Sequence, residues 1–398
     1  MRSPILFILA LTLAALPACG GGTFRVSRTG NYSFDKTGEK RTHEESAALE
    51  GTFEVIDISH EFGAVKVYGT DGPAEYTWSL SCWGRTPEDA ERFLKEITLT
   101  RTTEAGAHRF KLEIPEKPGN ALRGVESVLT LRVPRATQVR VANSFGDAEV
   151  TGISGAVTGN CSHCSVELED LTGALDWETS FDDLRARRIA GGTLKNAHGE
   201  LHVESVSGDL TARTSFDDAT IVDVGGSVEA QNAHGSLSIS RVGGRLTAET
   251  SFAKLVATEL GSSVVLRNSH GEIRASGVSG EIDAATSFAK IDVTASSERV
   301  KIQNSHGDVI LALLGDRVRE VDLETSFADV ALSVPAGLHP AVFVDQKHGD
   351  FSSPMPVSTA TDRANHADSG SLRLKVRHGD IEIEETSGLP AEKPAGGG

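Results

Sequence analysis

The stretch GELHVESVSGDLTARTSF, residues 199–216, contains the pattern that decides the fold. Apolar and polar residues alternate over 201–203 and again over 210–216. Between Val203 and Val206 the alternation moves by one residue, which we call a parity shift. A period of two indicates β-strands, and the Gly-Asp pair at 208–209 favours a turn. We therefore expect two short strands in this stretch, with corners at the parity shifts.

The same pattern recurs with a period of about 18 residues. Thr-Ser-Phe occurs at 179–181, 214–216, 250–252, 286–288 and 325–327, and Asn-Ala-His-Gly or Asn-Ser-His-Gly stands between most copies. Together they form one register of rings, here called the ring column: Phe145, His163, Phe181, His198, Phe216, His234, Phe252, His270, Phe288, His306, Phe327 and His348. Units this short cannot bury their apolar faces alone, whereas stacked units share one continuous core.

A second register lies two residues before each ring and is here called the polar column. Its members are Asn143, Cys161, Thr179, Asn196, Thr214, Asn232, Thr250, Asn268, Thr286, Asn304, Thr325 and Gln346. Stacked amides and hydroxyls are expected to hydrogen-bond along the axis, as in asparagine ladders. We expect the rings to stack through buried contacts, with imidazoles hydrogen-bonded to the backbone.

These registers predict an all-β fold: a single-stranded parallel β-solenoid of about 18-residue turns with a short N-terminal helix as a cap. Residues 86–95 predict the helix, because Thr86 can be its N-cap, Pro87 its first residue, and acidic residues follow. A solenoid needs such a cap because its terminal strands would otherwise expose unpaired backbone groups.

The histidines of the ring column could suggest a metal-binding array. A phenylalanine separates each from the next, so neighbouring histidines would lie two turns apart, about 10 Å. Two ligands of one zinc ion need metal–nitrogen bonds of about 2.1 Å. We therefore predict structural columns, with neither a metal site nor a cofactor.

Units such as NSHGEIRASGVSGEIDAA and NAHGELHVESVSGDLTAR resemble the β-strand repeats of the bacterial "putative adhesin" family, a domain of unknown function. The resemblance covers about residues 52–385 and is strongest over 143–330. It implies an exported or envelope-associated β-helix without recognised catalytic residues. The alternation of His and Phe is a feature of this chain and is not taken from the family.

The N-terminus, MRSPILFILALTLAALPACGGG, is typical of a bacterial secretory signal. Leu16-Pro17-Ala18-Cys19 resembles a lipobox, which implies a lipid on Cys19; a cleaved signal without an anchor is the alternative. The acyl chains would tether an extracytoplasmic protein to a bacterial membrane, on the periplasmic side or at the cell surface.

The chain divides into six predicted parts. They are a signal peptide (1–18), a lipidated flexible linker (19–51), an N-terminal β and cap region (52–135), regular repeats (136–352), irregular C-terminal coils (353–387) and a disordered tail (388–398).

Charge excludes one class of partner. The chain has 39 basic and 56 acidic residues, a net charge of −17, and its basic residues are scattered. We therefore expect no nucleic acid as a partner. An unknown protein or polysaccharide of the cell envelope is expected instead, besides the membrane.

Acidic residues at two corners suggest an alternative function, that of an enzyme. Asp182-Asp183 and Asp217-Asp218 occupy equivalent corners two turns apart, and carbohydrate-active β-helix enzymes use clustered acids. The next two equivalents are Ala253-Lys254 and Ala289-Lys290, so solvated turn residues explain the acids as well. We predict no catalytic residues.

The stretch NCSHCS at 160–165 could hold a metal, shuttle electrons or close a disulfide. Cys161 stands in the polar column and His163 in the ring column, and a tight turn brings residues three apart within disulfide range. We predict a Cys161–Cys164 disulfide, with metal binding and free thiols as alternatives. Cys82 is the remaining cysteine once Cys19 is set aside, so at least one thiol stays unpaired within the chain.

These expectations describe a non-enzymatic, membrane-anchored β-solenoid that acts as an adhesin-like or envelope scaffold and binding protein. A carbohydrate-active enzyme and an envelope-stress sensor or regulator are the alternatives.

Overall fold

A computed structural model describes residues 36–115, 119–315, 319–358 and 370–386. The predicted signal peptide, Cys19 and the predicted tail lie outside these residues. The described chain forms two compact units: a small one from segments up to Thr42, Ser81–Ile97 and Ile114–Val125, and a large one from the remainder. No helix in the described ranges is long and apolar enough to cross a membrane.

The small unit contains the α-helix. Helix α1 (Pro87–Glu96) begins after Thr86, whose side chain accepts a hydrogen bond from the backbone amide of Asp89 at 3.2 Å, and it buries Ala90 and Phe93. Proline at the first position and acids in the first turn explain why it starts there, as predicted from the sequence. Its role as a cap stays a prediction.

The other elements of the N-terminal region are β1 (Glu39–Ala48), β2 (Val55–Thr70), β3 (Glu75–Gly84), β4 (Thr98–Glu104), β5 (Ala107–Glu113), the 3-10 turn η1 (Gly119–Ala121) and β6 (Leu122–Pro134).

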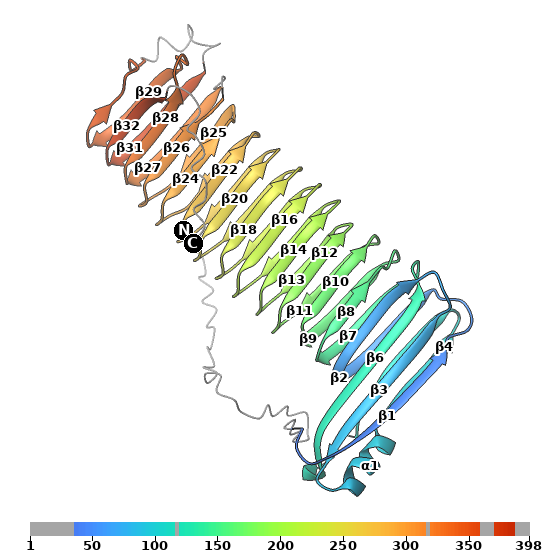
Figure 1. The fold of residues 1–398 in the computed structure, drawn as a ribbon. Coiled ribbons are helices and arrows are strands. Elements are labelled where there is room, and N and C mark those ends of the chain that lie inside the picture. Colours follow the sequence, from blue (N-terminus) through green and yellow to red (C-terminus); the bar gives the residue numbers. More distant parts are fainter. Residues whose placement is uncertain (1–35, 116–118, 316–318, 359–369, 387–398) are drawn as a thin grey trace, which may run out of the picture. The chain divides into compact units, whose positions relative to one another are not determined.

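The large unit is a parallel β-solenoid in which each coil adds one strand to each of two sheets (Figure 1). Sheet 1 contains, in spatial order, β7 (Gln138–Phe145), β9 (Val157–His163), β11 (Leu175–Thr179), β13 (Gly192–Asn196), β15 (Leu210–Thr214), β17 (Val228–Asn232), β19 (Leu246–Thr250), β21 (Val264–Asn268), β23 (Ile282–Ala285), β25 (Arg299–Gln303), β27 (Glu320–Phe327), β31 (Ser371–His378) and β29 (Ala341–His348). Sheet 2 contains β8 (Ala148–Thr151), β10 (Val166–Leu171), β12 (Leu184–Ile189), β14 (Leu201–Val206), β16 (Ala219–Val224), β18 (Leu237–Val242), β20 (Leu255–Leu260), β22 (Ile273–Val278), β24 (Ile291–Ala295), β26 (Val309–Leu313), β28 (Val330–Pro335), β32 (Ile381–Thr386) and β30 (Phe351–Ser352).

The register between coils follows the predicted repeat. Leu201 pairs with Ala219 and Ala219 with Leu237, while Leu210 pairs with Val228 in the other sheet. Each of these steps is 18 residues, so equivalent side chains stack along the axis. The inward residues of both sheets are almost fully buried and form the core. Burying one such side chain contributes about 1.5–3 kcal/mol, and the repetition explains how units of two short strands become stable.

The parity shift between Val203 and Val206 is a kink inside a strand. Ser205 has a positive φ of 60°, and the equivalent residues of neighbouring coils share this left-handed conformation. They are Gly152, Asp170, Arg188, Asp223, Arg241, Glu259 and Gly277. One left-handed residue turns both Val203 and Val206 inward, so the corner predicted at 203–206 is wrong, and the chain changes sheet over the following residues.

At the C-terminal end, the order of coils in space differs from their order along the chain. Strand β31 pairs with β27 on one side and with β29 on the other, and β32 likewise lies between β28 and β30. The coil 371–386 is therefore inserted before the coil 341–352. It contributes one strand to each sheet, β31 and β32.

Candidate functional site

The ring column is a continuous stack along one edge of the solenoid. Phe145 stacks on His163 at 4.7 Å between ring centroids, and Phe216 on His234 at 4.9 Å with planes 2° apart. Every step from Phe145 to Phe327 is a stacked contact of 4.4–5.2 Å. Phe62 of β2 extends the stack, with its ring 5.3 Å from that of Phe145. Ring pairs at such distances attract each other by about 0.5–1.5 kcal/mol beyond area burial.

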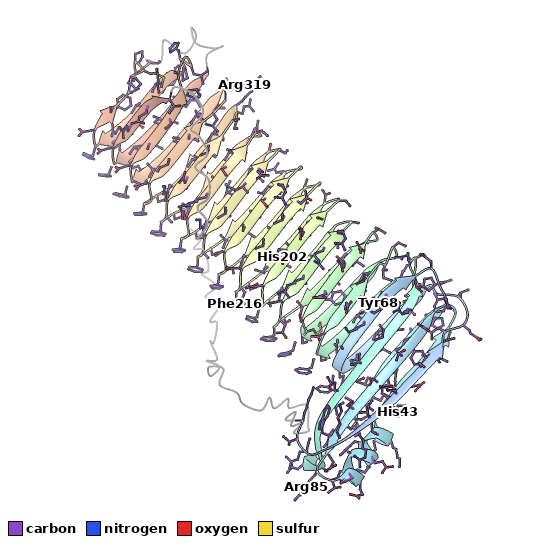
Figure 2. The ribbon with its side chains drawn as sticks, viewed as in Figure 1. His43, Tyr68, Arg85, His202, Phe216 and Arg319 are labelled. Atoms are coloured by element: carbon purple, nitrogen blue, oxygen red, sulfur yellow. A yellow bond between two sulfur atoms is a disulfide. The ribbon has the colours of Figure 1, made fainter. Side chains whose placement is uncertain are left out.

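Most of the rings are exposed to solvent, although their faces are in contact with the rings of neighbouring coils. Phe181, Phe216, Phe252, Phe288 and Phe327 have 48–56% of their surface open to solvent. Figure 2 shows Phe216 projecting from the edge of the ribbon. At Phe216, β15 has already ended at Thr214, so the alternation of that strand does not continue to the ring. Because neighbours cover the ring faces, the exposed surface consists mainly of ring edges.

Backbone contacts orient three of the imidazoles. Nδ1 of His234 lies 3.0 Å from the carbonyl oxygen of Ser215, and His270 and His306 make the equivalent contacts to Ser251 and Ser287 at 3.3 Å. A carbonyl oxygen only accepts, so Nδ1 carries the proton and donates. In the neutral ring, Nε2 is then the acceptor.

Except for Gln346, the polar column is buried, and it joins adjacent coils through the main chain. The amide nitrogens of Asn232 and Asn268 donate to the carbonyls of Asp217 and Ala253 on the preceding coil, at 2.8 and 2.7 Å. The hydroxyl of Thr250 donates to Gly235 at 3.3 Å. These hydrogen bonds run along the axis from one coil to the preceding one, and their acceptors are main-chain carbonyls. Asn232 Oδ1 also accepts from the amide of Gly235, which explains Asn and Gly three apart at these corners.

The column ends differently from the prediction. His348 was expected to follow Phe327, but His378 stacks on Phe327 at 4.9 Å, and His348 stacks on His378 at 4.8 Å. The insertion of coil 371–386 causes this change. His378 is thus a column member that the register missed, although the repeated His-Gly-Asp at 348–350 and 378–380 is a signal that could have revealed it.

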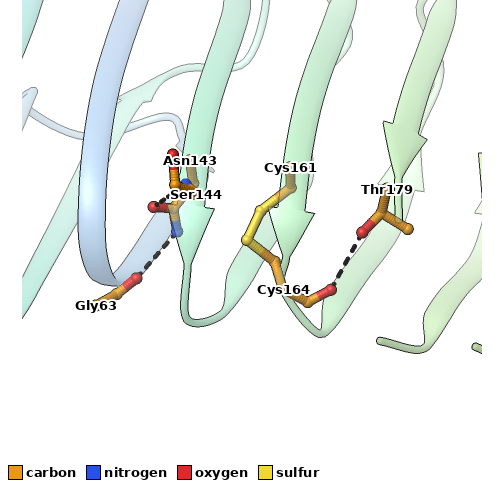
Figure 3. The surroundings of a disulfide bond; sticks show 6 residues. All are labelled: Gly63, Asn143, Ser144, Cys161, Cys164 and Thr179. Carbon is orange, nitrogen blue, oxygen red and sulfur yellow. Dashed lines mark hydrogen bonds between the residues drawn. A yellow bond between two sulfur atoms is a disulfide. The ribbon is translucent and has the colours of Figure 1, made fainter. Parts of the chain in front are cut away.

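Cys161 and Cys164 are joined by a disulfide across the corner (Figure 3), with Cα atoms 5.8 Å apart. The carbonyl of Cys164 accepts a hydrogen bond from the Thr179 hydroxyl at 3.3 Å, so the corner keeps the usual contact with the next coil. Cys82 is a buried free thiol of the small unit, and burial raises its pKa to about 12.

Reduction of this disulfide is expected to lower the free energy of unfolding by about 2 kcal/mol, because the bond closes a short loop. The double variant Cys161→Asn/Cys164→Gly converts the corner to the Asn-x-His-Gly form found two coils further on, at 196–199. It should unfold at a similar urea concentration with or without dithiothreitol. Wild-type unfolding that is indifferent to dithiothreitol would contradict a stabilising role.

The acidic corners are used in packing. Asp183 Oδ1 accepts from the backbone amide of Glu200 at 3.1 Å, Asp183 Oδ2 pairs with Arg185 at 2.9 Å, and Asp218 accepts from Ser236 at 2.8 Å. Burial raises the pKa of Asp182, with nearby His163 opposing the shift. These contacts explain Asp183 and Asp218 as turn residues that bind the next coil.

A shallow hollow of about 450 Å³ lies over sheet 1, lined by residues that include Arg245, Glu281, Asp283 and Arg299. Its charges are largely paired: Arg299 contacts Glu281 at 3.0 Å, and Arg267 contacts Asp283 at 2.7 Å. Exposed ion pairs of this kind are ordinary on the solvent-facing side of a sheet, so these charges do not indicate a bound ligand.

No protein-family model matches this chain, and no curated protein is similar to it in sequence. Among solved structures, a "putative cell adhesion protein" from Clostridium sporogenes is 8% identical, with 87% of this chain and 100% of that chain covered and a TM-score of 0.19. A "putative adhesin" from Parabacteroides distasonis is 10% identical, with 67% and 98% covered and a TM-score of 0.31. A "putative lipid binding protein" from the same species is 12% identical, with 74% and 94% covered and a TM-score of 0.28. Similarity at this level does not establish a shared function.

Proposed function

We propose that the chain is a non-enzymatic, adhesin-like binding protein of the bacterial envelope, tethered through a lipid on Cys19. The observation that carries the binding role is the exposed ring column. Five half-exposed phenylalanines follow one another at every second coil along one edge. Exposed apolar surface that recurs along one edge in this way is uncommon on proteins without a partner and marks interaction sites.

The exposed part of the rings favours a protein over a polysaccharide as the partner. Sugars pack against the faces of aromatic rings, and in the column each inner face is covered by a neighbour at 4.4–5.3 Å. Ring edges, in contrast, fit against apolar side chains and against the faces of other aromatic rings. We therefore assign an envelope protein with an apolar, aromatic-rich surface as the partner.

The test replaces the apolar edges of the phenylalanine rings and keeps a stacked ring at each position of the column. The triple variant Phe216→His/Phe252→His/Phe288→His uses the residue that alternate coils already carry. With EDTA present, it should bind at least about tenfold more weakly than wild type to cell envelopes isolated from the source bacterium, because the apolar edges are lost. Binding is measured by cosedimentation, and circular dichroism checks the fold.

The reverse variant His234→Phe/His270→Phe extends the apolar edge and should bind at least as well as wild type. Protease treatment of the envelopes should abolish binding, whereas periodate oxidation of sugars should leave it intact. Unchanged binding by the triple variant would refute the role of the column, and sensitivity to periodate alone would refute a protein partner.

A further inference from the structure

Among the described residues, the ring column places two imidazoles next to each other at one position. His348 and His378 have ring centroids 4.8 Å apart and planes 21° apart. Every other histidine of the column from His163 to His306 has a phenylalanine ring on each side. The argument against a metal ion, which rested on that alternation, therefore does not apply at the C-terminal end.

Main-chain contacts hold the two corners together. The amide of Gly379 donates to the carbonyl of His348 at 3.1 Å, and Gln346 Nε2 donates to the carbonyl of Gly379 at 2.7 Å. The amide of Asp350 donates to Asp380 Oδ1 at 2.8 Å. Both corners have the sequence His-Gly-Asp, so they present the two imidazoles in the same way. The pair is thus fixed by the backbone, while both rings are exposed to solvent.

We propose that His348 and His378 form a two-ligand site for a divalent transition-metal ion such as Zn²⁺, Ni²⁺ or Cu²⁺. Imidazole nitrogen suits these ions, whereas Ca²⁺ and Mg²⁺ require oxygen ligands. No group of three or more His, Cys, Asp or Glu residues in the described ranges is arranged to hold a metal ion. Water therefore completes the coordination.

The geometry requires a small movement of the rings. Two nitrogens on one tetrahedral zinc ion lie about 3.4 Å apart, given bonds of about 2.1 Å. The ring centroids are 4.8 Å apart, so the metal-binding edges must tilt toward each other. Exposed side chains rotate readily, and the loss of stacking opposes binding only weakly, since a stacked pair contributes about 0.5–1.5 kcal/mol.

Charge around the pair favours a cation. Asp350 and Asp380 each follow a ligand histidine by two residues, and Asp329 occupies the same corner position on the adjacent coil. Asp329 Oδ1 accepts from the amide of Asp380 at 2.8 Å, which continues the series of corner contacts. Lys347 and Arg377 directly precede the two histidines, so the three carboxylates outnumber two cations, and the remaining negative charge favours a divalent ion only weakly.

The test measures metal binding by the purified, chelator-treated full chain, with Zn²⁺ competing against a chromophoric indicator. One site should bind more tightly than the isolated histidines. His348→Phe and His378→Phe keep a ring in the stack but leave one imidazole, so each should weaken the tight site by at least about tenfold through loss of the second linked ligand. The matched control His270→Phe removes an imidazole flanked by phenylalanines and should leave the tight site unchanged.

A gain-of-function variant provides an independent readout. Phe327→His places a third imidazole beside His378 and His306, and it should tighten Zn²⁺ binding relative to wild type. Bound Cu²⁺ should show two nitrogen ligands by electron paramagnetic resonance in wild type and one in His348→Phe. The site is refuted if the tight binding survives both ligand substitutions, or if His270→Phe weakens it equally.

Discussion

Replacing Gly159 by alanine is expected to lower the free energy of unfolding by about 3 kcal/mol, at the upper end of the usual cost of overpacking a core. Gly159 pairs with Trp177 in sheet 1, and a Cβ atom at Gly159 would lie 2.3 Å from the indole ring. The Trp177 side chain is completely buried, so the ring cannot move into solvent. Urea denaturation followed by tryptophan fluorescence measures the loss.

The neighbouring coils indicate the compensating change. The same inward position is occupied by Leu194 and Ala212 on the following coils, so the column accommodates aliphatic side chains of different sizes. Trp177→Leu should recover most of the lost stability in the alanine background, although it opens a cavity when Gly159 is retained.

Gly261→Ala is the matched control. The nearest atom to its added methyl would be 3.7 Å away, so stability should change by less than about 1 kcal/mol. Equal losses from the substitutions at 159 and 261 would show that Trp177 packing is not the cause.

The repeat could be predicted from the sequence because equivalent positions carry equivalent chemistry. A buried Asn or Thr must donate to the preceding coil, and a ring two residues later must stack, so both recur every 18 residues. The period in turn determines the parallel register of both sheets. The N-terminal helix was equally predictable, since Thr86 and Pro87 act locally.

Two features were not predictable from the repeat. A pattern of alternation does not show where a strand ends, and the end of β15 at Thr214 leaves Phe216 exposed. The repeat also implies that coils stack in chain order, whereas β31 is inserted between β27 and β29 through long-range pairing. The pairing of His348 with His378, which is the basis of the proposed metal site, follows only from that insertion.

The first coil of the solenoid contains a buried histidine that should make the protein sensitive to acid. His60 pairs with Asn143 and is 2% exposed, and its Nε2 lies 2.9 Å from the hydroxyl of Ser127. Trp78 Nε1 donates to the same hydroxyl at 2.8 Å, which leaves the hydroxyl proton for the neutral imidazole. Burial lowers the pKa of His60 from 6.5 to about 4, with the nearby side chain of Asn143 opposing the shift.

Acidification from pH 7 to pH 4 is therefore expected to remove about 3 kcal/mol through His60 alone, since each unit of pKa difference corresponds to about 1.4 kcal/mol. The unfolded chain binds the proton near pH 6.5 and the folded chain only near pH 4, so stability is complete above the first value and falls below it. Urea denaturation of wild type and His60→Asn at pH 7, 5.5 and 4 isolates this contribution.

Asparagine occupies this position on other coils, and its amide does not take up a proton between pH 7 and pH 4. The difference in unfolding free energy between wild type and His60→Asn should therefore shift in favour of the variant as the pH falls. Asn268→Thr, which exchanges one residue of the polar column for the other, controls for the substitution itself and should follow the wild-type pH dependence. Parallel pH profiles for wild type and His60→Asn would show that the buried imidazole is not the acid-sensitive group.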